Sequence, residues 1–141
     1  MRASIISVAA LAALAATPVI AAQWLSIWRD FDSVDDHKYE VLLDLSSIGV
    51  NAASPNIRTA TVKYVRTTPR ARDSAADRFS YSITIKSFDC KSQRIRLDHS
   101  EVHFPDGTLQ YIDTDKNQGT WHAARSPVAR QLLSSVCAAT S

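Results

Sequence analysis

The chain is poor in several features that mark common functional classes. It contains only three glycines, and no glycine-rich segment of the kind that surrounds a bound phosphate. After residue 22 no stretch approaches the roughly 18 consecutive apolar residues that a transmembrane helix needs. No internal repeat is present, which argues against a repeat architecture. These absences favour one ordinary globular domain without a phosphate loop or a later membrane span.

The chain also lacks a strong excess of either charge. It carries 16 lysines and arginines against 14 aspartates and glutamates, a balance that argues against binding nucleic acid through bulk electrostatics. The charges are nevertheless uneven, because residues 29–44 are mainly acidic and residues 58–78 mainly basic. If these segments lie on different faces, the domain is a dipole. If they form adjacent strands, they neutralise one another.

The N-terminal segment has the features of a secretory signal peptide over residues 1–22. Arg2 provides the positive charge, residues 5–16 are mainly apolar, and residues 17–22 include small residues suited to cleavage. No cysteine follows the apolar run, so the residue that carries the lipid of a bacterial lipoprotein is absent. We therefore expect an exported protein, located in the periplasm, the outer cell envelope or the medium, with residues 23–141 as one domain.

Cysteine is another scarce residue, since only Cys90 and Cys137 are present. Two cysteines in an exported chain favour a single disulfide over two free thiols. For a closed loop of this length the chain-entropy model gives a stabilisation of roughly 4 kcal/mol. We expect a bond between Cys90 and Cys137 that joins a strand to a C-terminal helix.

Alternating apolar and polar residues predict strands along most of the domain, since period two is typical of a strand with one buried and one solvated face. Residues 43–56 instead run into a turn or a single helical turn, and residues 105–107 form a strong turn signal. The predicted strands cover residues 24–31, 39–44, 57–67, 79–90, 93–104, 108–113 and 120–123.

The clearest strand pattern lies just before Cys90. Phe79, Tyr81, Ile83 and Ile85 alternate with polar residues, so we expect these four side chains on the buried face. Further along the chain, the parity of the apolar residues changes between residues 98 and 101. A β-bulge there would explain the change.

A single helix is predicted at the C-terminus. Ser126 has the composition of a helix cap, and Pro127 suits the first helical turn. The predicted fold class is therefore α+β, a mostly antiparallel sheet of about six strands packed against one C-terminal helix, with one disulfide. The apolar stripe that would face the sheet consists of Val128, Leu132, Leu133 and Val136.

Residue types suited to catalysis gather near one predicted strand. Glu101 and His103, with Arg94 and Arg96 nearby, are the types that an acid–base phosphodiester site uses. No spacing rule singles them out, and a solvated strand face explains them as well. His99 and His103 are four residues apart, too far along an extended strand to share one metal ion, so we expect surface histidines and no metal site.

Two further patterns have structural explanations. Residues 113–119 imitate the first half of a calcium loop, but the glycine falls one place late and Ala124 stands where the bidentate glutamate belongs, so a polar turn is the better interpretation. Trp24, Trp28 and Trp121 could form an exposed binding surface. Because the chain has only four phenylalanines and one methionine, we expect these tryptophans in the core.

The order of these signals resembles the surface-adhesin protein E family. The resemblance covers nearly all of residues 23–141 and implies a small antiparallel sheet packed on one helix, with bridged cysteines. Its adhesin members imply exposure on the bacterial surface, dimerisation, and binding of matrix or plasma proteins such as laminin and vitronectin. The segments that carry it are the tryptophan-rich start, residues 39–48 (YEVLLDLSSI), 61–64 (TVKY), 89–90 (DC), 119–121 (GTW), 126–127 (SP) and Cys137.

The resulting hypothesis is an exported, non-enzymatic envelope or secreted protein that recognises extracellular proteins or glycans and requires no cofactor. A homodimer is what the family resemblance implies for it. The candidate partner-binding surface is the basic segment with Arg66, Arg70 and Arg72, because arginine clusters pair with acidic groups on glycoproteins or polysaccharides. Two alternatives stay open. One is a periplasmic small-ligand-binding or inhibitor module, and the other is a small secreted hydrolase that uses Glu101 and His103.

Overall fold

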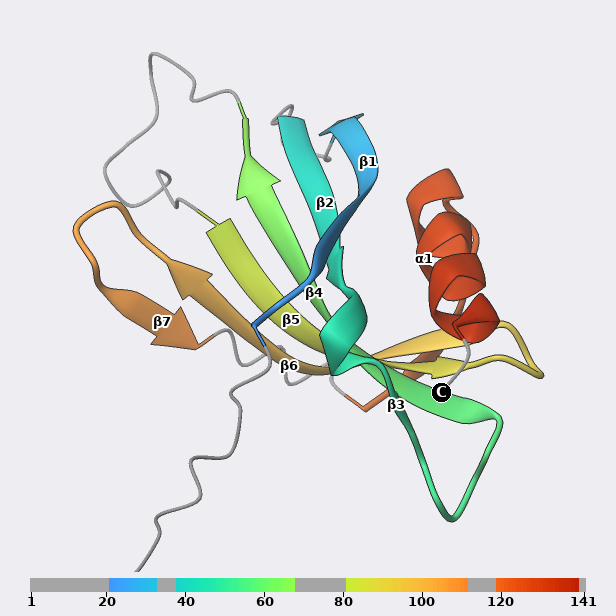
Figure 1. The fold of residues 1–141 in the computed structure, drawn as a ribbon. Coiled ribbons are helices and arrows are strands. Elements are labelled where there is room, and N and C mark those ends of the chain that lie inside the picture. Colours follow the sequence, from blue (N-terminus) through green and yellow to red (C-terminus); the bar gives the residue numbers. More distant parts are fainter. Residues whose placement is uncertain (1–20, 33–37, 68–80, 112–118, 140–141) are drawn as a thin grey trace, which may run out of the picture.

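The computed structural model describes residues 21–32, 38–67, 81–111 and 119–139, which form a twisted antiparallel sheet with one helix beside it (Figure 1). The strand order is β1-β2-β4-β5-β6-β7, with β3 paired to β4 and β8 paired to β6. The predicted fold class is confirmed. The elements are β1 (Trp24–Asp32), β2 (Lys38–Asp44), the 3-10 turn η1 (Leu45–Ser47), β3 (Gly49–Val50), β4 (Ile57–Arg66), β5 (Tyr81–Asp89), β6 (Arg94–His103), β7 (Leu109–Tyr111), β8 (Trp121–Ala123) and α1 (Pro127–Ala138).

Local sequence signals explain where several elements begin. Asp44 accepts a hydrogen bond from the backbone N–H of Ser46 and so caps η1, the single helical turn expected in residues 43–56. Ser126 accepts from the backbone N–H of Ala129 at 3.1 Å and caps α1, with Pro127 in the first turn. The two-residue strand β3 was not predicted, because such a short pairing leaves no periodic pattern.

The core lies between α1 and one face of the sheet. The predicted apolar stripe of α1 is buried, as expected, and α1 contacts β1, β4, β5 and β6. Among the described residues no helix has the length and hydropathy that a membrane span requires. The buried core cluster consists of Val41, Leu43, Ala60, Val62, Phe88, Val128, Leu132, Leu133 and Val136.

The predicted buried face of β5 is wrong. Tyr81 and Ile83 are only half-buried and Ile85 is 40% exposed, whereas Phe88 is fully buried. Tyr81, Ile83 and Ile85 point to the sheet face opposite α1, and Phe79 lies outside the described residues. Alternation shows that the two faces of a strand differ, but the covered face is decided by where the helix packs.

A β-bulge in β6 decides which of its side chains face α1. Ile85 pairs with His99 and the next residue, Lys86, pairs with Leu97, so Asp98 is the extra residue. The parity change expected between residues 98 and 101 is thus confirmed, with the bulge at Asp98. As a result, Leu97 and Val102 share the helix side, while His99 lies on the opposite face with the odd-numbered residues that follow it.

The last turn of the C-terminal helix is bonded to the sheet. The predicted disulfide is confirmed, since Cys90 and Cys137 are bonded with 5.7 Å between their Cα atoms. In addition, Arg58 Nη1 of β4 donates to the carbonyl oxygen of Val136 at 2.9 Å and to that of Ala139. One covalent bond and one side chain therefore hold the last turn of α1.

Candidate functional site

The sheet face opposite α1 is the main candidate for a binding surface. Side chains of directly paired antiparallel residues share a face, so the strand register identifies its members. Within the described residues no helix or strand covers it, and Tyr111 is 63% exposed. We call this surface the open face and define it by Trp24, Lys63, Tyr81, Ile83, Ile85, His99, Glu101, His103, Leu109 and Tyr111.

A row of contacts begins at the β1 edge of the open face. The ammonium group of Lys63 on β4 lies 4.1 Å from the ring centroid of Tyr81 on β5 and 5.7 Å from that of Trp24 on β1. Both contacts have the geometry of cation–π interactions. The lysine therefore joins two aromatic rings from different strands and holds its charge among them.

The row continues from Tyr81 to the far edge of the sheet. Tyr81 stacks on His103 with 4.3 Å between ring centroids, and His103 Nε2 lies 2.9 Å from a carboxylate oxygen of Glu101. The second oxygen of Glu101 lies 3.6 Å from Nε2 of His99, whose ring lies 5.6 Å from that of Tyr111. Side chains of β1, β4, β5, β6 and β7 are thus connected by successive contacts.

The charge state of Glu101 follows from this row. The hydrogen bond from His103 lowers the pKa of Glu101; partial burial opposes this shift, and the hydrogen bond from His99 reinforces it. An ionised carboxylate between two imidazoles fixes both rings. A general acid needs the opposite shift, a raised pKa, so the local electrostatics do not prepare Glu101 for that role.

The proposed catalytic residues are only partly brought together. Glu101 and His103 are in contact, whereas Arg94 and Arg96 lie at the other end of β6, beyond the bulge, and pair with β8. Within the described ranges, no group of three histidine, cysteine, aspartate or glutamate side chains is arranged to hold a metal ion. The expectation of no metal site stays a prediction, and residues 113–118 of the calcium-like segment lie outside the described residues.

The tryptophans were expected in the core, and for two of them this is wrong. Trp24 is 38% exposed and Trp28 is 37% exposed, because both lie on the edge strand β1, whose register with β2 is irregular. Phe88 and aliphatic side chains fill the core instead. Trp121 is half-buried on β8.

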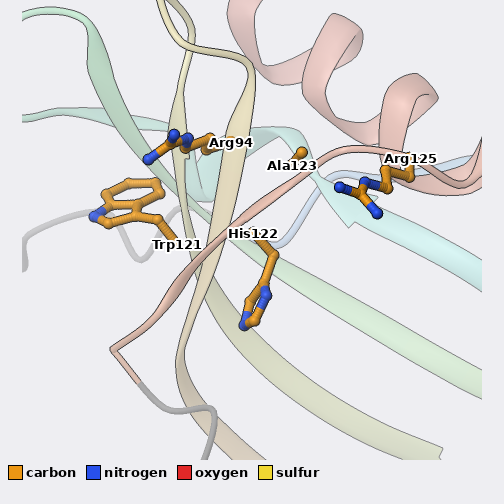
Figure 2. Close-up of a pocket in the computed structure, with 5 residues that line it drawn as sticks. All are labelled: Arg94, Trp121, His122, Ala123 and Arg125. Atoms are coloured by element: carbon orange, nitrogen blue, oxygen red, sulfur yellow. The ribbon is translucent and has the colours of Figure 1, made fainter.

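A second feature is a basic depression at the short strand β8 (Figure 2). The depression is open, has a volume of about 460 Å³, and no acidic side chain lines it. Arg94 lies beside the indole of Trp121, while His122 and Arg125 lie on the other side of β8. We call this feature the β8 depression, and its lining residues are Arg94, Trp121, His122, Ala123 and Arg125.

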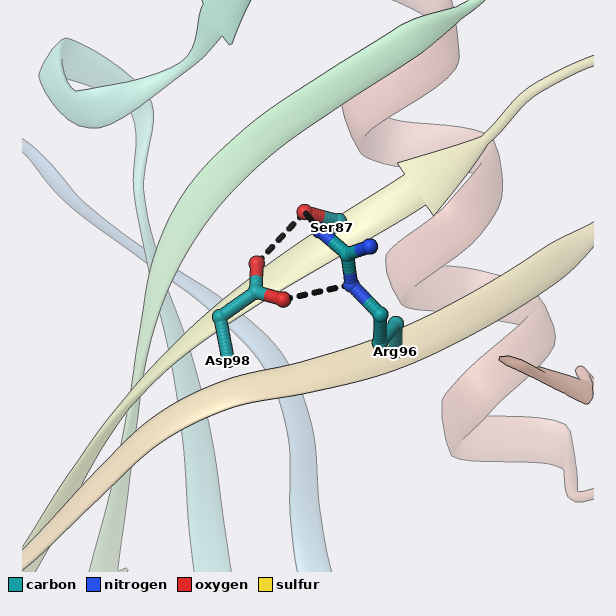
Figure 3. Close-up of polar contacts among 3 residues, drawn as sticks. All are labelled: Ser87, Arg96 and Asp98. Atoms are coloured by element: carbon teal, nitrogen blue, oxygen red, sulfur yellow. Dashed lines mark hydrogen bonds and ion pairs between the residues drawn. The ribbon is translucent and has the colours of Figure 1, made fainter. Parts of the chain in front are cut away.

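A polar cluster connects the bulge to this depression (Figure 3). Asp98, the bulged residue, accepts a hydrogen bond from Ser87 Oγ at 2.5 Å and one from Arg96 Nε at 2.6 Å. The guanidinium of Arg96 lies 4.8 Å from the ring centroid of Trp121. The bulge therefore neutralises Arg96 and holds it against Trp121.

The predicted arginine surface is described only in part. Arg66, at the end of β4, is half-buried, and its Nε is screened from solvent. Arg70 and Arg72 lie outside the described residues. Their role in partner binding stays a prediction, whereas Arg58 from the same basic segment holds the end of α1.

The comparison with protein families agrees with the fold. The family model of surface-adhesin protein E matches residues 24–138. The chain belongs to the surface-adhesin protein E family. The match includes every described strand, α1 and both cysteines. Neither the search of curated proteins nor the search of solved structures found a match.

Family membership gives a coarse function and confirms the resemblance noted from the sequence. It indicates a surface adhesin, a class of proteins that are exported to the cell surface and bind extracellular ligands. The open face and the β8 depression were missed by sequence reasoning. The alternation around Tyr81 and the basic residues around Trp121 were visible, but only the strand register shows that they share surfaces with side chains from other strands.

Proposed function

We propose that this member of the surface-adhesin protein E family is exported and binds extracellular matrix or plasma proteins through its open face, without catalysing a reaction. The observation that carries this proposal is the continuous row of aromatic, basic and acidic side chains across five strands of an otherwise uncovered sheet face. The helix stabilises the opposite face, which leaves this one available to a partner.

The composition of the open face suits a folded protein partner. Tyrosine and tryptophan are enriched where interface energy is concentrated, because they bury a large area at a low cost in side-chain entropy. The contacts of Lys63 with Trp24 and Tyr81 fix these rings before binding, so less conformational freedom is lost on association. A partner surface that offers apolar groups with acidic groups near Lys63 would complement it.

The test compares solution binding of residues 23–141 to laminin, vitronectin and other matrix or plasma proteins. Replacing Ile85 by Ser and Tyr111 by Ala removes two exposed open-face side chains, and we expect at least roughly tenfold weaker binding. Val50→Ser is the matched control, since Val50 is 43% exposed on β3, away from the open face. Equal affinity of the wild type and the open-face variant would contradict the proposal.

A second variant tests whether the partner binds the arginine segment rather than the open face. Changing Arg66, Arg70 and Arg72 to Ser tests whether the basic segment binds the partner. Loss of binding in this variant alone would move the contact surface to that segment. Loss in both variants would show that the two regions contribute to one interface.

The family resemblance also implies a homodimer. Light scattering of the purified domain over a range of concentrations tests this prediction. If the open-face variant is monomeric where the wild type is dimeric, the open face is used between two copies, and the proposal of a partner protein on that face is wrong.

A further inference from the structure

We propose that the β8 depression binds sulfate or carboxylate groups of an acidic polysaccharide, at a site separate from the open face. The two regions lie on opposite halves of β6, since β8 pairs with residues 94–96 and β7 with residues 101–103. The choice of an extracellular ligand rests on the proposed function. The charge and shape of the site come from this region alone.

The two arginines of the β8 depression, Arg94 and Arg125, form no close ion pair with a described carboxylate. In the described part of the chain, no carboxylate lies within 4 Å of a charged nitrogen of Arg94 or Arg125. The acidic residue paired with Arg94 in the sheet is Asp89. Its carboxylate accepts hydrogen bonds from the Ser92 hydroxyl and from the backbone N–H groups of Ser92 and Lys91 in the turn after β5. These hydrogen bonds lower the pKa of Asp89 more than the charge of Arg94 does, so Asp89 offsets the charge of Arg94 only from a distance.

Arg96 behaves differently from these two arginines. Its charge is balanced by Asp98, and its guanidinium packs on Trp121. It therefore supports the wall of the depression, while Arg94, Arg125 and, when protonated, His122 provide the positive charge. A guanidinium can bind a sulfate or carboxylate through two parallel hydrogen bonds, which makes arginine well suited to such ligands.

The arrangement of the basic side chains favours a polyanion, with charged groups at intervals, over a single small anion. The basic groups lie on both sides of β8 and border an open depression rather than a closed cavity (Figure 2). A ligand that reaches both sides must carry anionic groups at intervals along an extended chain. The half-buried indole of Trp121 adds an apolar surface on the Arg94 side of β8, suited to the C–H groups of a sugar ring.

The experiment measures retention on immobilised heparin as a function of salt. We expect the Arg94→Ser, Arg125→Ser double variant to bind roughly tenfold or more weakly, because charge-assisted hydrogen bonds are lost. The matched control is Arg29→Ser, Lys38→Ser. It removes the same net charge from exposed residues of β1 and β2, at the other end of the strand order. Equal loss in both variants would reduce the interaction to bulk charge and overturn the proposal.

Competing ligands identify which anionic group the β8 depression binds. Competition by heparin with no effect of hyaluronate assigns a sulfate site, and competition by both assigns a site for either anion. If polyglutamate or duplex DNA competes as well as heparin, the site does not select polysaccharide and the proposal is wrong. Absence of heparin binding by the wild type also overturns it. The open-face variant must retain heparin binding, so this test and the protein-binding test fail independently.

Discussion

At the scale of single residues, Arg58 has a structural role within a segment that the sequence marks as a binding surface. The last carbonyl groups of a helix have no partner within the helix and need donors from elsewhere. Arg58 donates to the carbonyl oxygens of Val136 and Ala139 and so supplies this need.

We expect Arg58→Met to lower the free energy of unfolding by about 1–3 kcal/mol, because carbonyl groups of α1 lose a charged donor. Urea denaturation of the purified domain measures the change. Arg94→Met is the control, since Arg94 is exposed and should change stability by less than about 0.5 kcal/mol. Similar stability of the two variants would contradict a structural role for Arg58.

Glu101 gives a pH dependence at the same scale. The hydrogen bond from His103 holds the pKa of Glu101 below its ordinary value of 4.5 in the folded protein. The unfolded chain therefore binds this proton more readily than the folded protein does. The contribution of Glu101 to stability is complete above the unfolded pKa and is lost as the pH falls through the folded pKa.

We expect wild-type stability to fall more steeply with decreasing pH, below about pH 4.5, than the stability of Glu101→Gln. Urea midpoints measured between pH 6 and pH 3 test this. Identical slopes for the two proteins in the acid range would show that the contacts of Glu101 with His103 and His99 do not stabilise the folded state.

At the scale of elements, β5 was predicted correctly as a strand, but the face of it that is buried was predicted wrongly. Phe88 lies beneath α1 with no exposed surface, while Ile85 is 40% exposed on the open face. We expect Phe88→Ala to cost about 3–5 kcal/mol and Ile85→Ala less than about 1.5 kcal/mol. Thermal and urea denaturation measure both. If Ile85→Ala lowered stability more than Phe88→Ala, the buried face predicted from the sequence would be correct after all.

The disulfide acts between elements, since it joins the turn after β5 to the last turn of α1. The two cysteines are 47 residues apart, so the bond restricts a long segment of the unfolded chain. We expect replacement of Cys90 and Cys137 by Ser to lower stability by roughly 2–5 kcal/mol. Hydrogen exchange should show α1 losing protection before the central strands β4 and β5. Loss of protection in all elements together would mean that α1 is not the weaker unit.

At the scale of the whole molecule, the structure decides between the two arrangements of charge that the sequence left open. Within the described residues, β2 from the acidic segment pairs with β4 from the basic segment, and Tyr39 lies opposite Arg66. The described parts of the two segments are therefore adjacent strands, the arrangement in which the charges were expected to offset one another rather than form a dipole. A depression lined by basic and no acidic side chains, the β8 depression, lies at the other end of the strand order.

Export is a prediction for the whole chain. We expect the protein produced in a bacterial host to lose residues 1–22, and its new N-terminus to lie at or within one or two residues of Gln23. Fractionation into cytoplasm, periplasm, outer membrane and medium, with mass spectrometry of the intact protein, measures both. Recovery of the full-length chain in the cytoplasm alone would contradict export and remove the basis for an adhesin.

The sequence by itself determined most of the strands, the C-terminal helix and the disulfide that joins helix to sheet. The alternation in β2, β4 and β6, the Ser126 cap and the paired cysteines each depend on neighbours in the chain or on a count, so they can be recognised without coordinates. The bulge was also visible, because an extra residue changes the parity of the apolar positions.

The tertiary structure alone decided which faces are buried and which side chains meet. A single helix can cover only one face of the sheet, and its position, not the strand pattern, placed Phe88 in the core and Tyr81 outside. The contact of Lys63 with Tyr81, and the placement of Arg94 beside Trp121, follow from the register between strands that are distant in the sequence. Such pairings depend on the packing of the whole sheet, because no local interaction along the chain specifies them.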